Sequence, residues 1–114
     1  MNNNKLEIEK FKNIKDFITD LQVQYLDKIA NVILADQPYT RTQIRAKNRS
    51  HDQTDIRRKI AYIARIKYNI AGLIIADYLN VSAVQVSEYI HSAYNRASVD
   101  KNYSKVIVEL LNKS

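Results

Sequence analysis

Cysteine and tryptophan are absent from this sequence of 114 residues, and glycine and proline occur once each, at Gly72 and Pro38. Without cysteine there is no disulfide framework and no thiolate metal site, so we expect a cytoplasmic protein whose side-chain contacts alone hold the fold together. One glycine and one proline are too few for the tight turns of an all-β chain. The composition therefore predicts an all-α fold, built as a single domain over residues 1–114.

Long apolar runs are also missing. No stretch of about 18 apolar residues occurs, and the residues after Met1 lack the apolar centre of a secretion signal. We therefore expect a protein that is neither exported nor inserted into a membrane.

Clusters of catalytic or metal-binding residue types are lacking as well. The two histidines, His51 and His91, stand 40 positions apart, and neither has a second His or Cys at ligand spacing. The acidic residues are scattered over polar helix faces, where an acid–base enzyme would need convergent groups. The sequence predicts no enzyme, no metal site and no cofactor.

The positive charge is concentrated in one segment. The chain has a net charge of +6, and residues 41–70 contain nine Lys and Arg against only Asp52 and Asp55. The flanking segments are close to neutral. Such a block is typical of a protein with a polyanion as its partner.

Apolar spacing predicts five to six helices. Residues 1–35 form one long helix, or a helix pair that meets near Thr19 and Asp20, and Pro38 follows its end. The polar segment 40–54 forms a basic loop with Ile44 as its main apolar residue. A helix at 55–68 follows, capped by Asp52 or Thr54, then helices at 71–79 and 83–96, and a last helix at 98–112. The stripe of the first helix comprises Leu6, Phe11, Ile14, Ile18, Leu21, Tyr25, Ile29 and Val32.

Residues 71–96 have the spacing of a helix-turn-helix, in which the second helix can lie in the DNA major groove. Asn80 stands where the turn becomes left-handed, a conformation that Asn tolerates better than most residues. Small or apolar residues occupy the inward positions, namely Ile75, Ala76, Leu79, Val81, Val86 and either Tyr89 or Ile90.

The outward residues of the second helix are candidates for base contacts. They are Ser82, Ala83, Gln85, Ser87 and Glu88, followed by His91. Gln85 can pair with adenine, and Ala83 or Val84 can touch a thymine methyl group. Because no Lys or Arg stands between Leu73 and Tyr94, backbone or minor-groove contacts must come from neighbours. The candidates for these contacts are Arg41, Arg45, Lys47, Arg49, Arg57 and Arg58.

The order of these parts, with the segment Arg57-Arg58-Lys59-Ile60-Ala61-Tyr62-Ile63-Ala64-Arg65 and then Ile75-Ala76-Asp77-Tyr78-Leu79, resembles the DNA-binding C-terminal domain of the bacterial replication initiator DnaA. The resemblance covers residues 20–111. It implies a fold related to the Trp repressor, with the helix-turn-helix in the major groove and the basic loop in the minor groove. The family's Gly-Gly-Arg-Asp-His-Thr-Thr-Val run is replaced by Asn80 to Val86, and no ATPase motif is present.

We therefore expect a protein that binds double-stranded DNA, associated with a bacterial or phage-type nucleoid, as a transcriptional regulator or replication accessory factor. The alternative is a helical protein–protein interaction module, in which the stripe of the first helix pairs with a partner or with a second copy of the chain.

Overall fold

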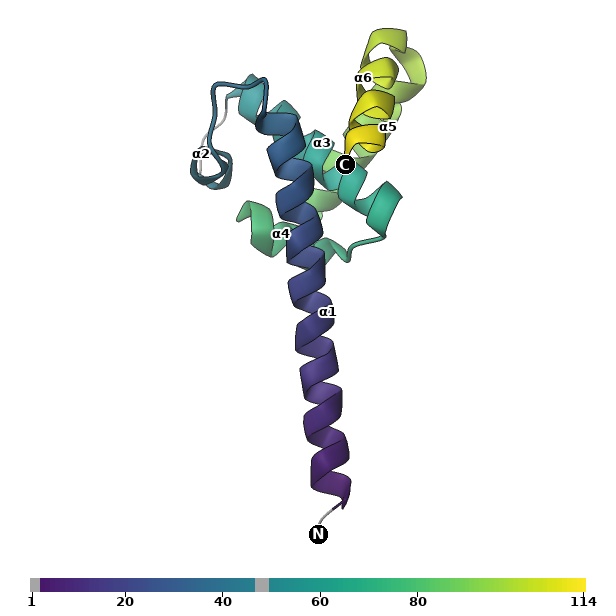
Figure 1. The fold of residues 1–114 in the computed structure, drawn as a ribbon. Coiled ribbons are helices and arrows are strands. Elements are labelled where there is room, and N and C mark those ends of the chain that lie inside the picture. Colours follow the sequence, from purple (N-terminus) through teal and green to yellow (C-terminus); the bar gives the residue numbers. More distant parts are fainter. Residues whose placement is uncertain (1–2, 47–49) are drawn as a thin grey trace.

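The computed structural model describes residues 3–46 and 50–114, with side chains from Ile14 onward in the first helix. These residues form helices and no strand, which confirms the predicted all-α fold (Figure 1). The helices are α1 (Asn3–Leu34), α2 (Arg41–Arg45), α3 (His51–Tyr68), α4 (Gly72–Leu79), α5 (Ala83–Val99) and α6 (Lys101–Lys113). None of the described helices is long and apolar enough to cross a lipid bilayer.

The first helix is continuous. Thr19, at the predicted break, has helical neighbours on both sides, and its hydroxyl donates to the backbone carbonyl of Lys15 at 3.1 Å within the helix. This hydrogen bond is typical of a threonine inside a helix rather than at a cap. Of the two predicted arrangements, the structure therefore has the single long helix.

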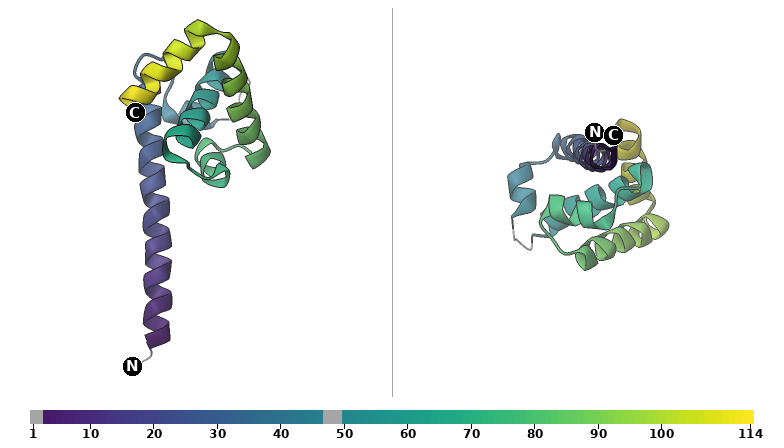
Figure 2. Two further views of the ribbon diagram at one scale, coloured as in Figure 1. Left: turned by 90° about the vertical axis from the view of Figure 1, so that its right-hand side faces the viewer. Right: turned by 90° about the horizontal axis from the view of Figure 1, so that it is seen from below.

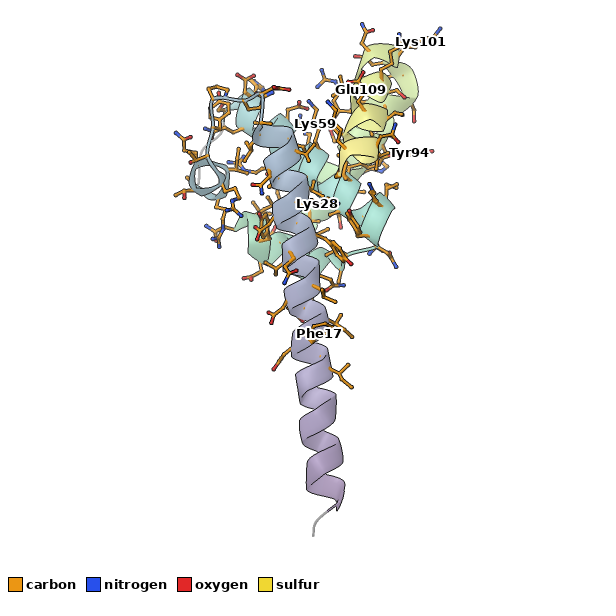
Figure 3. All side chains as sticks on the ribbon, in the orientation of Figure 1. Phe17, Lys28, Lys59, Tyr94, Lys101 and Glu109 are labelled. Atoms are coloured by element: carbon orange, nitrogen blue, oxygen red, sulfur yellow. The ribbon has the colours of Figure 1, made fainter. Side chains whose placement is uncertain are left out.

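The amino-terminal part of α1, residues 3–20, projects beyond the other helices and is called the arm below (Figures 1 and 2). The molecule is 61 Å long but only 26 Å wide. The described side chains of the arm, residues 14–20, are all exposed, and Figure 3 shows Phe17 pointing away from the other helices.

The core is contacted by a different side of α1 from the predicted stripe. Leu26, Ile29, Ala30 and Ile33 are buried, whereas Ile18 of the stripe is 49% exposed. The described arm residues of α1 are exposed, so periodicity over the whole helix could not identify the buried side. Of the described stripe residues, Ile29 is the one that is fully buried.

Helix α3 lies at the centre of the fold and contacts α1 and α5 most extensively. It begins at His51, and Ser50 rather than the predicted Asp52 or Thr54 precedes its first turn. The helix is longer than predicted. Gln53 in its first turn is buried, but a polar residue adds nothing to the apolar spacing from which the helix was predicted. Asn69 ends α3 in the left-handed conformation, at φ 50°.

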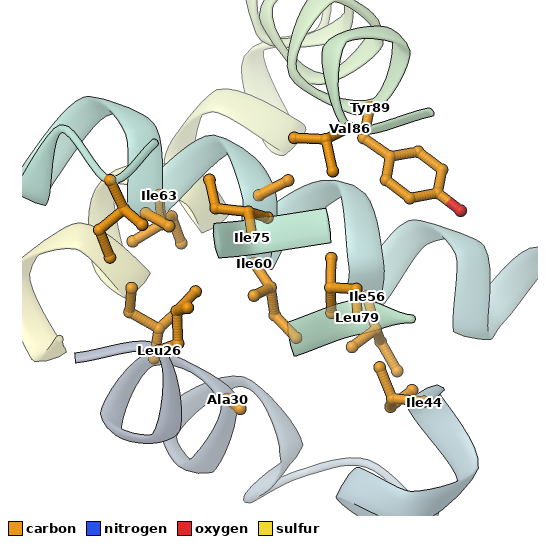
Figure 4. Packing of buried hydrophobic residues seen from close by; sticks show 14 of the residues in the cluster. Leu26, Ala30, Ile44, Ile56, Ile60, Ile63, Ile75, Leu79, Val86 and Tyr89 are labelled. Atoms are coloured by element: carbon orange, nitrogen blue, oxygen red, sulfur yellow. The ribbon is translucent and has the colours of Figure 1, made fainter. Parts of the chain in front are cut away.

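Helices α4 and α5 follow with the predicted turn between them. Asn80 adopts φ 57°, and the Ser82 hydroxyl caps α5 by accepting from the backbone N–H of Gln85 at 3.1 Å. Ile75, Leu79, Val86 and Tyr89 are buried as the spacing predicted, and with Ile44, Ile56, Ile60 and Ile63 they form the core seen in Figure 4.

The last helix begins after Asp100, whose carboxylate accepts from the backbone N–H groups of Asn102 and Tyr103 at 3.0 and 3.1 Å. Asp100 thus caps the last helix. Tyr103 and Ile107 are buried against the remaining helices, and Val106 stays exposed. Helix α6 therefore closes one end of the core and leaves the free side of α5 uncovered.

Candidate nucleic-acid interface

One side of α5 is turned away from the core. Val86, Tyr89 and Ala93 are buried on the inward side. The opposite side contains Val84, Glu88, His91 and Asn95, spaced by four, three and four residues, and all four are exposed. We call these four residues the outer face of α5. It begins within the first turn of the helix, where helix-turn-helix proteins contact base edges.

The predicted base-contact residues fall at this end of α5, although on different sides. Ser82, Ala83, Ser87 and Glu88 are exposed. Gln85 is half-buried because it lines a hollow of about 230 Å³ together with Ala46, Arg57, Asn80, Val81, Ser82 and Tyr89. The sequence analysis did not identify Asn95, although it lies seven residues after Glu88 and thus on the same face of a regular helix.

The described end of the basic segment lies beside the turn between α4 and α5. The Asn80 side-chain amide donates to the backbone carbonyl of Arg45 at 3.2 Å. Buried Ile44 anchors α2 in the core, and a capping box starts the helix, in which Thr40 and Gln43 exchange hydrogen bonds of 2.8 and 3.2 Å. Arg45 is exposed at the end of this short helix. The fold thus holds the backbone of Arg45 next to the turn before α5, and the residue also lines a hollow with Asp27 of α1 and Tyr78 of α4.

Arg57 has a different role from the predicted contact with DNA. The residue is only 3% exposed. Its Nε donates to the carbonyl of Ile44 at 2.8 Å, and its Nη2 donates to the carbonyl of Ala46 at 3.1 Å. Its guanidinium therefore satisfies the last carbonyls of α2 inside the protein, and little of its surface is open to a partner. A helix this short has orphan carbonyls that need such donors.

The other residues predicted to contact the DNA backbone differ in their surroundings. Arg41 is exposed, and its Nη1 donates to the Asp27 carboxylate of α1 at 2.6 Å. Arg58 is half-buried. Burial and the Asp55 carboxylate raise the pKa of the Tyr103 phenol in α6 to about 12, against the positive charges of Arg96 and Arg58. Lys47 and Arg49 lie outside the described residues. Of the four described residues, Arg45 has its backbone carbonyl at the turn, and Arg57 lines the hollow beside it.

Asp27 joins three helices beside this segment. Its Oδ1 accepts from Arg41 of α2 and from the hydroxyl of Tyr78 of α4, the latter at 2.7 Å. Partial burial, together with the Asp27 carboxylate, raises the pKa of Tyr78 to about 12. The phenol therefore stays protonated and remains a hydrogen-bond donor near neutral pH. This contact fixes α2 and α4 to α1, and so fixes the position of Arg45.

A second exposed arginine lies on the other side of α5. Arg65 of α3 lines a groove of about 480 Å³ that also contains Ser87 and His91 of α5, with Tyr62, Ile66, Gly72, Val86, Ile90 and Tyr94. Gln85 and Ser87 are two residues apart, so they lie on nearly opposite sides of the helix. The end of α2, whose neighbour Ala46 lines the hollow with Gln85, and Arg65, beside Ser87, therefore lie on opposite sides of α5. Sequence spacing could not show this position of Arg65, because it depends on how α3 crosses α5.

The described residues contain no group of His, Asp or Glu arranged to hold a metal ion. None of the family models, curated proteins or solved structures compared with this chain matches it.

Proposed function

We propose that this protein binds duplex DNA, with the first turns of α5 in the major groove. The observation that carries the proposal is that α5 has the end of α2, with exposed Arg45, on one side and exposed Arg65 of α3 on the other. A helix that lies in the major groove has a phosphate backbone on each side, and such backbones are bound by arginines. The outer face of α5 has three polar side chains and the apolar Val84, which fit base edges.

The arrangement agrees with the resemblance to the DNA-binding domain of the DnaA initiator, in which a basic segment accompanies a helix-turn-helix. We propose that Arg45 contacts the backbone or the adjacent minor groove, together with the residues that follow it. A DNA-binding domain of this kind suits a transcriptional regulator or a replication accessory factor, acting at the nucleoid.

Substitution of the two arginines tests the proposal. Arg45→Gln and Arg65→Gln should each weaken binding to all duplex sequences and reduce the slope of log affinity against log salt by about one. Lys105→Gln is a matched control, because Lys105 is exposed on α6. Equal slopes for the wild type and both arginine variants would argue against the proposed orientation.

The arm supports a second candidate function, a helical interaction module. Ile14, Phe17 and Ile18 are all at least 49% exposed on a helix that extends past the remaining fold. Exposed apolar residues gathered in this way mark many protein–protein contact sites. An Ile18→Glu variant separates the two functions, because it should abolish association through the arm and leave DNA binding by α5 intact.

A further inference from the structure

A branched apolar side chain stands on the outer face of α5, where the proposed function would place DNA. Val84 is the second residue of α5 and is 70% exposed. Its neighbours Ala83 and Ser87 are small and exposed as well. An apolar contact there is therefore open to any surface that approaches the start of the helix.

Positive charge is missing from the same surface. The sequence has no Lys or Arg between Lys67 and Arg96, a segment that includes α4, the turn and most of α5. Arg and Lys make the commonest specific contact with guanine, through its O6 and N7 atoms. The outer face therefore lacks the side chains that most often select guanine.

The groups that are present match a different base. The C5-methyl group of thymine is the one apolar group that a base pair presents in the major groove, and apolar side chains contact it. Val84 is the large apolar side chain of the outer face, since Glu88, His91 and Asn95 are polar. We infer that Val84 reads a thymine methyl group and that the bases under the first turn of α5 are an A·T pair. This inference rests on the proposed function.

The test removes the methyl group from the DNA and the valine from the protein. The purified protein first selects its site from random-sequence duplex DNA, and each thymine of that site is then replaced by uracil in turn. Loss of one buried methyl contact should weaken wild-type binding about fourfold at one position at least. In Val84→Ala this penalty should disappear, whereas Val108→Ala, an equally conservative change at an exposed residue of α6, should retain it.

The outcomes separate the inference from the proposed function. If the protein selects a site but uracil has no effect, or if the uracil penalty persists in Val84→Ala, the thymine contact is refuted and DNA binding stands. A selected site with guanine under the first turn of α5 would also overturn the inference. If the protein binds no duplex even at low salt, the proposed function fails and the inference fails with it.

Discussion

The side-chain amide of Asn80 hydrogen-bonds the backbone carbonyl of Arg45 at 3.2 Å, and this contact joins the turn before α5 to the end of α2. Asn80 also adopts the left-handed conformation that ends α4. A glycine would adopt this conformation more easily. Asparagine additionally supplies the donor that holds Arg45 beside α5, so one residue serves both the turn and the proposed interface.

Two substitutions of Asn80 should therefore differ in how much they lower the free energy of unfolding. Asn80→Ala should lower the free energy of unfolding by about 1–2 kcal/mol, because alanine is strained at positive φ and lacks the amide. Asn80→Gly relieves the strain and should cost less, while it still frees α2 from the turn. Denaturant unfolding of both variants measures the difference. Equal destabilisation would mean that the backbone conformation of Asn80 contributes little.

Removal of the Arg57 guanidinium should destabilise the fold. Arg57→Met keeps most of the buried volume but leaves the carbonyls of Ile44 and Ala46 without these donors. We expect a loss of about 2–4 kcal/mol in the free energy of unfolding, measured with denaturant. A Met variant as stable as the wild type but with weaker DNA binding would instead restore the original prediction of a phosphate contact.

Stability should fall at alkaline pH because of Tyr78. Its pKa is about 12 in the folded protein, against an ordinary value of 10.0. The folded state thus holds the phenolic proton more tightly, and this stabilisation is complete below about pH 10 and lost as the pH rises towards about 12. Tyr78→Phe should be less stable than the wild type at neutral pH, and the gap should narrow across this window. The measurement is denaturant unfolding at a series of pH values, and a constant gap would contradict the account.

The two ends of α1 should respond differently to substitution. Ile29→Ala removes a fully buried side chain and should cost about 2–5 kcal/mol. Ile18→Ala removes an exposed side chain of the arm and should change the stability of the monomer by at most about 0.5 kcal/mol. Thermal unfolding at several protein concentrations provides the comparison. A large, concentration-dependent loss for Ile18→Ala would show that the arm is covered by another copy of the chain.

The elements whose signals are local were predictable from the sequence. The left-handed Asn69 and Asn80, the cap at Ser82 and the buried positions of α4 and α5 all follow from residue type and spacing over a few residues. Features set by contacts between distant segments were not predictable. The buried side of α1 depends on where the other helices end, and the burial of Arg57 depends on the carbonyls of α2, more than ten residues earlier.

The same limit applies to the candidate site. Basic residues close together in the sequence were predicted to act together, yet the fold buries Arg57, bonds Arg41 to Asp27 and half-buries Arg58. Arg65, from a later turn of α3, reaches the groove beside Ser87 instead. Charge density along the chain therefore predicted a polyanion partner. The candidate contact residues could be selected only from the tertiary structure.

The most direct test of the central claim is selection of binding sites from random-sequence duplex DNA by the purified protein, at two salt concentrations. We predict a recovered sequence motif and an affinity that falls steeply as the salt concentration rises, because the phosphate contacts displace counterions. No binding even at low salt would contradict the account and would favour the arm as the functional surface of this protein.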